Sequence, residues 1–181
     1  MWTVGHSTRS LDEVVALAHA HRITLIADVR KIPRSRRHPH FNADALARDL
    51  PAAGLAYVPM PGLGGLRAPR APSINTAWRN PSFRAYADYM QTDEFAAHLE
   101  ALLERAQRDA VAVMCAEALW WRCHRSLIAD ALVARGVGVE HIVSTERAEP
   151  HVLRPWARVQ GTRVFYPGQP TLFDPGEDAR V

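Results

Sequence analysis

The sequence predicts a single three-layer α/β/α domain with a mostly parallel, Rossmann-like sheet. Three observations predict it. The chain has 181 residues, of which 48% are hydrophobic and 23% charged, values typical of a globular domain with a substantial core. Short apolar runs alternate with segments of helical spacing, a pattern that favours parallel strands joined by right-handed crossovers. The run VAVM at 111–114 is continuously apolar, as expected for a strand covered on both faces.

Each element has its own signal along the chain. Strands are expected at 2–7, 23–30, 55–60, 109–117 and 139–144. Helices are expected at 11–22, 42–54, 82–108 with a break at 91–93, and 124–136. Ser10 and Glu13 form a capping box for the first helix, and Gly136 ends the last one. The Gly- and Pro-rich segment 61–73 is expected to be loop.

The pattern predicts residues 1–160 as the α/β domain and 161–181 as a C-terminal tail. No apolar run approaches the roughly 20 residues that cross a bilayer, and the N-terminus lacks the pattern of a signal peptide. We therefore expect a cytoplasmic protein without membrane association, in which both cysteines are reduced thiols. The residues name no required cofactor.

Reactive side chains follow the expected strands where ligands bind in an open parallel sheet, at the carboxyl ends. They are Gly5, His6 and Ser7 after the first strand, Asp28 and Arg30 after the second, and Cys115 and Glu117 after the fourth. If these strand ends meet at one edge, His6, Asp28, Cys115 and Glu117 share one cleft.

The stretch MCAEALWWRCHRS at 114–126 holds both cysteines of the chain. Cys123 and His124 lie near a helix start, where free amides and neighbouring arginines lower the pKa of a thiol. For Cys115 considered by itself, the simpler interpretation is a small, buried apolar residue with a structural role. The candidate catalytic residues are Glu117, Asp28, His6, Cys115, Cys123 and His124. The candidate substrate-binding residues are Gly5, Ser7, Arg30, Arg34, Arg79, Arg122, Arg125 and Trp121.

Three chemistries remain open. Cys115, Cys123 and His124, with His6, could bind zinc or iron, although C-x7-C-H is not a standard ligand spacing. A thiolate could act as nucleophile with a histidine as base. Glu117 or Asp28 could act as acid, base or nucleophile while arginines hold a phosphate.

We rank the carboxylate chemistry first, because a single anionic substrate would then contact both the catalytic carboxylates and the arginines of the basic loop RKIPRSRRHPH at 30–40. The expected substrate is then a nucleotide or nucleic acid, and the reaction a hydrolysis or transfer. A non-catalytic module that binds nucleotide or DNA is the further alternative.

Several motifs in order resemble the family called domain of unknown function 488. They are GHSTRS, ADVRKIPRSRRHPHFN, LGG, WRNPSFRAYADYM, and MCAE followed by RCHRSLIADAL. The positions that match its signature are Gly5, His6, Ser7, Asp28, Arg30, Arg34, Arg79, Cys115, Glu117, Cys123, His124 and Arg125. The resemblance, which runs from about Thr3 to His141 and into the tail, implies a site and no particular reaction.

A looser likeness is to rhodanese-type sulfurtransferases, which also have a D-V-R strand end and a cysteine after a strand. By that analogy Cys115 would carry the persulfide, and the alternative enzyme is a sulfurtransferase or phosphatase using Cys115 or Cys123. Here Glu117, two tryptophans and Cys123 intervene before the helix, unlike the tight loop of that family.

The tail contains QPTLF, in which Gln169, Leu172 and Phe173 match a Q-x-x-L-F pattern. This pattern resembles the peptide by which bacterial proteins bind the replication sliding clamp, with two apolar anchors and one polar contact. A clamp partner would favour a role in DNA repair or modification, in which an extruded base meets the carboxylates and Trp121 or Trp78.

Overall fold

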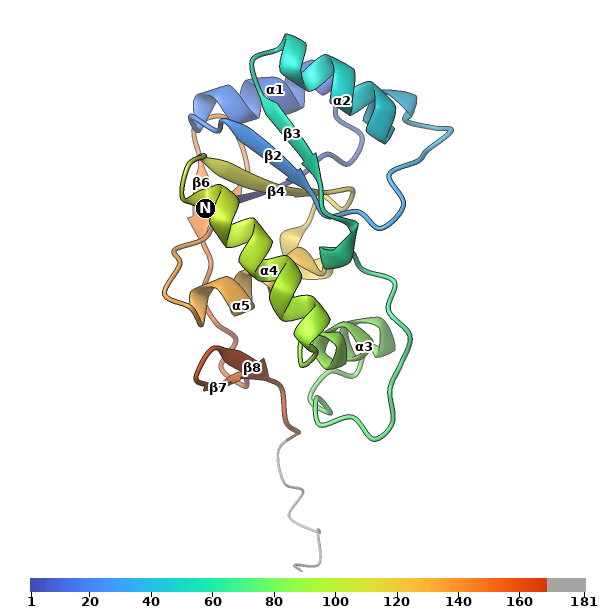
Figure 1. Cartoon of the computed structure of the whole chain (residues 1–181), viewed down its shortest axis with the longest axis vertical. Coiled ribbons are helices and arrows are strands. Elements are labelled where there is room, and N and C mark those ends of the chain that lie inside the picture. Colours follow the sequence, from blue (N-terminus) through green and yellow to red (C-terminus); the bar gives the residue numbers. More distant parts are fainter. Residues whose placement is uncertain (169–181) are drawn as a thin grey trace, which may run out of the picture.

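The computed structural model describes residues 1–168 of the chain, built around one six-stranded sheet (Figure 1). The strands are β1 (Trp2–Gly5), β2 (Leu25–Asp28), β3 (Ala56–Pro59), β4 (Val111–Cys115), β5 (Glu140–Ile142) and β6 (Ala148–Pro150). Their order across the sheet is β3-β2-β4-β1-β5-β6. β1 to β5 pair in parallel, and β6 pairs antiparallel to β5. The predicted α/β fold with a mostly parallel sheet is confirmed.

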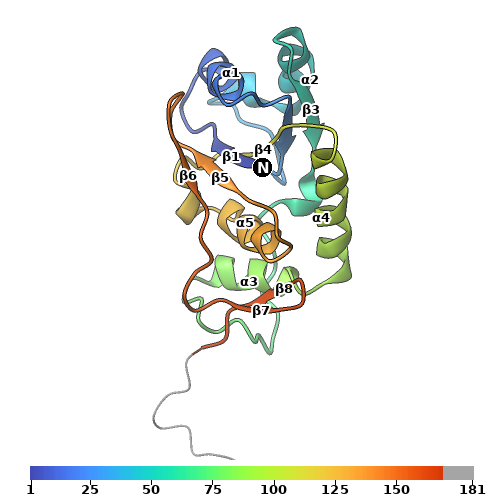
Figure 2. The same cartoon turned by 90° about the vertical axis from the view of Figure 1, so that its left-hand side faces the viewer.

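Helices cover both faces of the sheet, as Figure 2 shows from the side. They are α1 (Leu11–Ala20), α2 (Ala43–Ala52), α3 (Pro81–Tyr89), α4 (Asp93–Ala106) and α5 (Arg125–Val133). In the described part of the chain, three short 3-10 helices lie in the connections: η1 (Pro39–Phe41), η2 (Pro61–Leu63) and η3 (Trp120–Arg122). The capping box of Ser10 and Glu13 is present, and the predicted break separates α3 from α4, where Thr92 caps α4.

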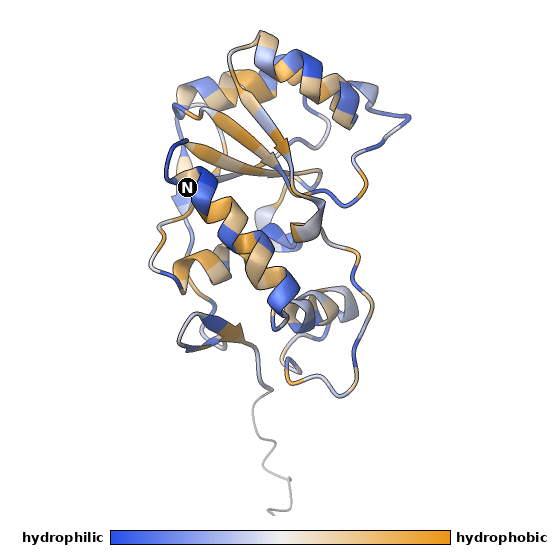
Figure 3. Ribbon diagram, in the orientation of Figure 1, coloured by the Kyte–Doolittle hydropathy of each residue, from blue (hydrophilic) through white to orange (hydrophobic). Residues whose placement is uncertain are grey.

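The two faces of the sheet pack into separate cores. Alternation along β2 directs Leu25 and Ala27 toward α3, α4 and α5, and Ile26 toward α1 and α2. β4 divides in the same way, with Val113 in the first core and Met114 in the second. The central strands are therefore apolar on both sides, and much of their length is orange, the colour of hydrophobic residues, in Figure 3.

A hairpin of β7 (Arg158–Gln160) and β8 (Arg163–Phe165) follows the sheet. Tyr166 after it is fully buried and donates a 2.7 Å hydrogen bond to Asp130 of α5. The expected boundary at residue 160 thus falls inside a packed hairpin, and the domain continues through Tyr166. Within residues 1–168, no helix combines the length and apolarity that a bilayer crossing needs.

Candidate active site

A cavity of about 440 Å³ opens beside the carboxyl end of β4. Its lining comes from three separate parts of the chain: Gly65, Leu66, Ser82, Phe83, Tyr86, Cys115, Ala116, Glu117, Arg122, Cys123 and His124. This is where an open parallel sheet places its ligand, and the volume suits a small molecule. Five of the sequence-predicted residues, namely Cys115, Glu117, Arg122, Cys123 and His124, therefore line one cavity.

Both thiols and one imidazole gather at this cavity. The ligand atoms of Cys115, Cys123 and His124 all lie within 4.8 Å of one another. Cys123 Sγ lies 3.7 Å from His124 Nδ1. Cys115 and Cys123 are only 8% and 5% exposed, and both line the cavity. We call these three residues the thiol–imidazole cluster.

The His124 ring is held in one orientation by its surroundings. Its Nε2 lies 3.2 Å from the carbonyl oxygen of Val29, which can only accept, so Nε2 carries the proton. In the neutral ring Nδ1 is then an unprotonated acceptor directed at the thiols. Tyr86 packs against the ring at 5.2 Å between centroids. A Cβ at Gly65 would lie 3.1 Å from Nδ1, so glycine lets the loop pass close to this nitrogen.

Arg125 was expected to bind substrate, but it lies buried behind the cluster. It is 1% exposed, its Nε donates to Cys123 Sγ at 3.4 Å, and its Nη2 donates to the Glu117 carbonyl. Arg125 is therefore a positioning residue for the loop between β4 and α5 and does not reach a substrate. Gly5 is buried against the same contact, because a Cβ there would overlap the Glu117 carbonyl.

The pKa values of the two thiols are shifted in opposite directions. A hydrogen bond from Cys115 lowers the pKa of Cys123, and the charge of Arg125 lowers it further. The same hydrogen bond, together with burial, raises the pKa of Cys115. Cys123 is therefore the thiolate of the pair and Cys115 the donor.

The cavity rim is polar on one side and apolar on the other. Glu117 and Arg122 are exposed there, and the Glu117 carboxylate accepts a 3.2 Å hydrogen bond from the Leu119 amide. Phe83 of α3 and the exposed Leu66 supply apolar surface opposite. The arrangement suits a ligand with an apolar ring and an anionic group.

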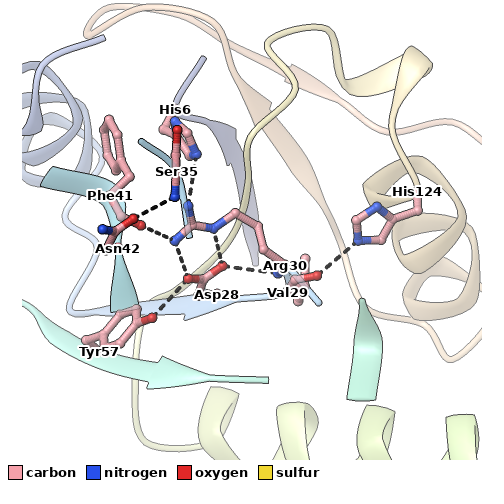
Figure 4. A network of polar contacts seen from close by, with 9 residues as sticks. All are labelled: His6, Asp28, Val29, Arg30, Ser35, Phe41, Asn42, Tyr57 and His124. Carbon is pink, nitrogen blue, oxygen red and sulfur yellow. Dashed lines mark hydrogen bonds and ion pairs between the residues drawn. The ribbon is translucent and has the colours of Figure 1, made fainter. Parts of the chain in front are cut away.

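Asp28, Arg30 and His6 form a different network, shown in Figure 4. Arg30 donates to both oxygens of Asp28, from Nε at 2.8 Å and Nη2 at 2.6 Å, and Tyr57 donates to the same carboxylate at 2.9 Å. Arg30 Nη1 also donates to His6 Nε2 at 3.2 Å. His6 stacks on Phe41 with centroids 4.0 Å apart. Burial, with Arg30 nearby, lowers the pKa of His6 to about 4.

The expectation of one shared cleft is wrong for His6 and Asp28. Asp28 is in phase with Ile26, on the α1–α2 face, whereas Cys115 belongs to the core of the other face. The Asp28 carboxylate is buried in its ion pair, and no atom of His6, Asp28 or Arg30 lines the cavity. These residues therefore hold the loop after β2 and do not meet the thiols.

The remaining candidates lie outside the cavity. Ser7 has a left-handed backbone with φ of 47° and donates its amide to the Ala116 carbonyl, so it braces the strand ends. Arg34 and Arg79 are exposed elsewhere. Trp121 is 50% exposed, edge-on to Trp120. Gln169, Leu172 and Phe173 lie outside the described residues.

Two features of this region were not predicted. One is the wall from α3, whose helical spacing places Phe83 and Tyr86 on one face, a signal that the sequence does contain. The other is a buried chain of hydrogen bonds: Thr3 to His141 at 2.7 Å, His141 to His151 at 2.9 Å, and His151 to Asp130 at 2.8 Å. Because these residues lie far apart in sequence, no local pattern joins them.

The His141 ring connects this buried chain to the loop before α5. Trp120 stacks on it with centroids 3.9 Å apart and an interplanar angle of 6°. Burial, followed by the charges of its neighbours His151, Arg125 and Arg154, lowers the pKa of His141 to about 3. The neutral imidazole is thus one support of the segment that carries Arg122 and Cys123.

The fold and the cavity define a three-layer α/β protein with a thiol–imidazole cluster at the carboxyl edge of its sheet. A family model described as domain of unknown function DUF488 matches residues 10–132, more than half of the chain. The protein therefore belongs to this family. No curated protein and no solved structure matches the chain.

Proposed function

We propose that this protein is an enzyme that hydrolyses, or transfers a group from, a nucleotide-like phosphate substrate in the cavity beside β4. The observation that carries the proposal is the meeting of the thiol–imidazole cluster with Glu117 and Arg122 in one cavity. A cavity that combines reactive groups with a carboxylate and a guanidinium provides for both chemistry and anion binding.

The apolar wall supports a substrate with a planar ring. Phe83 and Leu66 offer contact surface for a base, and Arg122 at the rim provides a fork of donors for a phosphate. Glu117 takes the role of acid or base at the exposed end of the cavity. Asp28, which was the other candidate for that role, is withdrawn because its ion pair with Arg30 is buried.

A basic depression adjoins the cavity and extends the proposed binding surface. This depression of about 990 Å³ is lined by residues that include Lys31, Arg34 and Arg36. Lys31 Nζ donates to the Leu66 carbonyl at the cavity rim, at 3.3 Å. A substrate with several phosphates, or a nucleic-acid strand, can therefore contact both surfaces.

The test is binding and turnover of a defined panel: nucleoside mono-, di- and triphosphates and short single-stranded DNA, followed by mass spectrometry of products. Arg122→Gln should weaken binding by about tenfold or more, because a hydrogen bond between charged groups contributes about 1.5–3 kcal/mol. Arg108→Gln, an exposed arginine on the turn before β4, is the matched control. Equal affinities in the two variants, or no panel member bound, contradict the proposal.

The second candidate is a thiol-dependent enzyme of the sulfurtransferase or phosphatase kind. The contact that favours it is Arg125 Nε on Cys123 Sγ, which stabilises a thiolate at the cavity. This geometry favours Cys123 as the nucleophile, whereas the rhodanese analogy favours Cys115. Alkylation of both thiols should abolish turnover in a thiol enzyme, and protection of Cys123 by a bound substrate analogue should preserve it.

We further propose that the substrate is DNA and that the protein acts in repair. This proposal rests on the exposed arginines of the basic loop. DNA affinity should fall steeply with salt, and the slope should become shallower when Arg34, Arg36 and Arg37 are replaced by glutamine. Sliding-clamp binding is a separate proposal, checked with a synthetic peptide of residues 164–181 and its Leu172→Ala, Phe173→Ala form. Non-catalytic DNA binding is the result if binding occurs without any product.

A further inference from the structure

We propose that Cys115, Cys123 and His124 bind one zinc ion, with a fourth coordination position that opens into the cavity. The site goes beyond the proposed function, because zinc binding does not depend on which substrate enters the cavity. Two thiolates and one imidazole form a donor set that favours zinc over magnesium or calcium, which prefer oxygen.

The distances fit tetrahedral coordination without rearrangement of the backbone. Zinc–sulfur and zinc–nitrogen bonds of about 2.3 and 2.0 Å, at a tetrahedral angle, separate the two donor atoms by roughly 3.5 Å. Cys123 Sγ and His124 Nδ1 lie 3.7 Å apart, and Cys115 Sγ lies within 4.8 Å of both. One ion can therefore contact all three atoms after small side-chain rotations.

His124 already has the tautomer that a zinc ligand requires. A coordinating histidine commonly donates its second ring N–H to a carbonyl or carboxylate, which leaves the other nitrogen free to bind the metal. His124 donates from Nε2 to the Val29 carbonyl, so its Nδ1 lone pair is directed toward the two sulfur atoms. The ring cannot turn away easily, because Tyr86 packs on one side and the loop at Gly65 passes close by.

The surroundings of the sulfur atoms also resemble those of a metal thiolate. Arg125 Nε donates to Cys123 Sγ at 3.4 Å, a hydrogen bond that stabilises the deprotonated ligand and orients it. The two thiolates balance the charge of the zinc ion, and Arg125 adds one positive charge beside them. Three protein ligands and a free position are the arrangement of catalytic zinc, whereas structural zinc has four protein ligands.

The open position faces the groups that could use it. All three ligands line the cavity, and so do Glu117 and Arg122. A water molecule on the zinc would have a pKa near neutrality, and Glu117 is the carboxylate available to accept its proton. Zinc binding thus gives Cys115 and Cys123 the same role, that of metal ligands. A thiol-nucleophile mechanism would use only one of them, and a carboxylate mechanism would use neither.

The experiment is reconstitution of the reduced, metal-free chain with Co²⁺, a spectroscopic substitute for zinc. The expected result is one Co²⁺ per chain, with the strong visible bands of tetrahedral cobalt and a thiolate-to-cobalt charge-transfer band. Zn²⁺ should displace it. Weak bands typical of octahedral cobalt, without charge transfer, overturn the proposal.

Variants assign the ligands. Cys115→Ser and Cys123→Ser should each halve the charge-transfer band or abolish binding, and His124→Asn should lose the tetrahedral spectrum. His19→Gln, on the opposite face of the sheet, is the matched control and should bind as wild type does. Circular dichroism checks each fold. If a cysteine variant does not fold, His124→Asn decides, since His124 is only half-buried, and unchanged cobalt bands in it overturn the assignment.

The zinc site and the proposed function fail separately. Tetrahedral Co²⁺ binding without binding of any nucleotide leaves the zinc site standing and removes the substrate. Nucleotide turnover in protein that shows no thiolate–cobalt band removes the zinc site and leaves the thiol or carboxylate chemistry of the proposed function.

Discussion

Asp28 and Arg30, two residues apart in sequence, form a two-pronged ion pair on the α1–α2 face of the sheet. The pair is buried, and Tyr57 and the Phe41 carbonyl complete its hydrogen bonds. Burial and the Asp28 charge both raise the pKa of Tyr57. A complete network of this kind fixes the loop after β2, but it leaves any single partner costly to remove.

Asp28→Asn should lower the free energy of unfolding by about 3–5 kcal/mol, because it leaves the Arg30 charge buried without its counterion. Urea denaturation followed by circular dichroism measures the change. Asp49→Asn is the matched control, since it breaks the exposed pair with Arg48 and should cost less than about 1 kcal/mol. Equal losses in the two variants would show that water reaches Arg30 in the folded state.

Stability should fall as the pH drops below about 6.5. The folded pKa of His141 is lowered to about 3 and that of His6 to about 4, whereas both are near 6.5 in the unfolded chain. Between those values the unfolded state binds more protons, so acid favours unfolding. His141→Gln should flatten part of this slope in a series of urea unfolding measurements at different pH. A wild-type slope in the His141 variant contradicts the assignment.

Gly5→Ala should displace the loop between β4 and α5, which lines the cavity. The new Cβ would lie 2.8 Å from the Glu117 carbonyl carbon and 2.9 Å from Arg125 Nη2. Overpacking of this kind typically costs about 1–3 kcal/mol, and the displaced loop carries Cys123. Gly138→Ala is the control, because nothing lies within 4 Å of its Cβ position. Thermal unfolding compares the two, and similar melting temperatures would mean that the loop yields freely.

The end of the folded domain can be located by truncation. A chain that ends at residue 160 loses β8 and the bond from Tyr166 to Asp130, and we expect it to unfold or to lose more than about 3 kcal/mol, the cost of deleting one large buried aromatic side chain. A chain that ends at Gly168 keeps every contact described here and should unfold like the full chain. Limited proteolysis and urea denaturation distinguish these results.

Periodicity predicted β1 to β5, the five helices and the break before α4, because buried faces impose regular spacing on those segments. It did not predict β6, β7 and β8, because these three-residue strands bury little of their side chains: β7 is exposed throughout, β6 has no fully buried residue, and β8 buries only Val164. Such short strands are defined by their pairing partner and not by their own composition.

The candidate site was predicted in part for a similar reason. Cys115, Glu117, Cys123 and His124 lie close in sequence, and the turn from β4 into α5 brings them together. Asp28 depends on register between two strands. Ala27 pairs with Val113 and Asp28 with Met114, which places Asp28 and Cys115 on opposite faces. A shift of one residue would reverse that outcome, and sequence alone does not determine it.

The acceptor for His124 Nε2 is a main-chain oxygen, so every amino acid at position 29 would supply it equally. Ordinary mutagenesis therefore cannot delete this bond directly. Only chemical replacement of the peptide unit, or a change in the course of the backbone between β2 and the basic loop, would free the imidazole. The tautomer of His124 is therefore determined by the course of the backbone at Val29. This residue is adjacent in sequence to both Asp28 and Arg30, whose ion pair lies on the opposite face of the sheet.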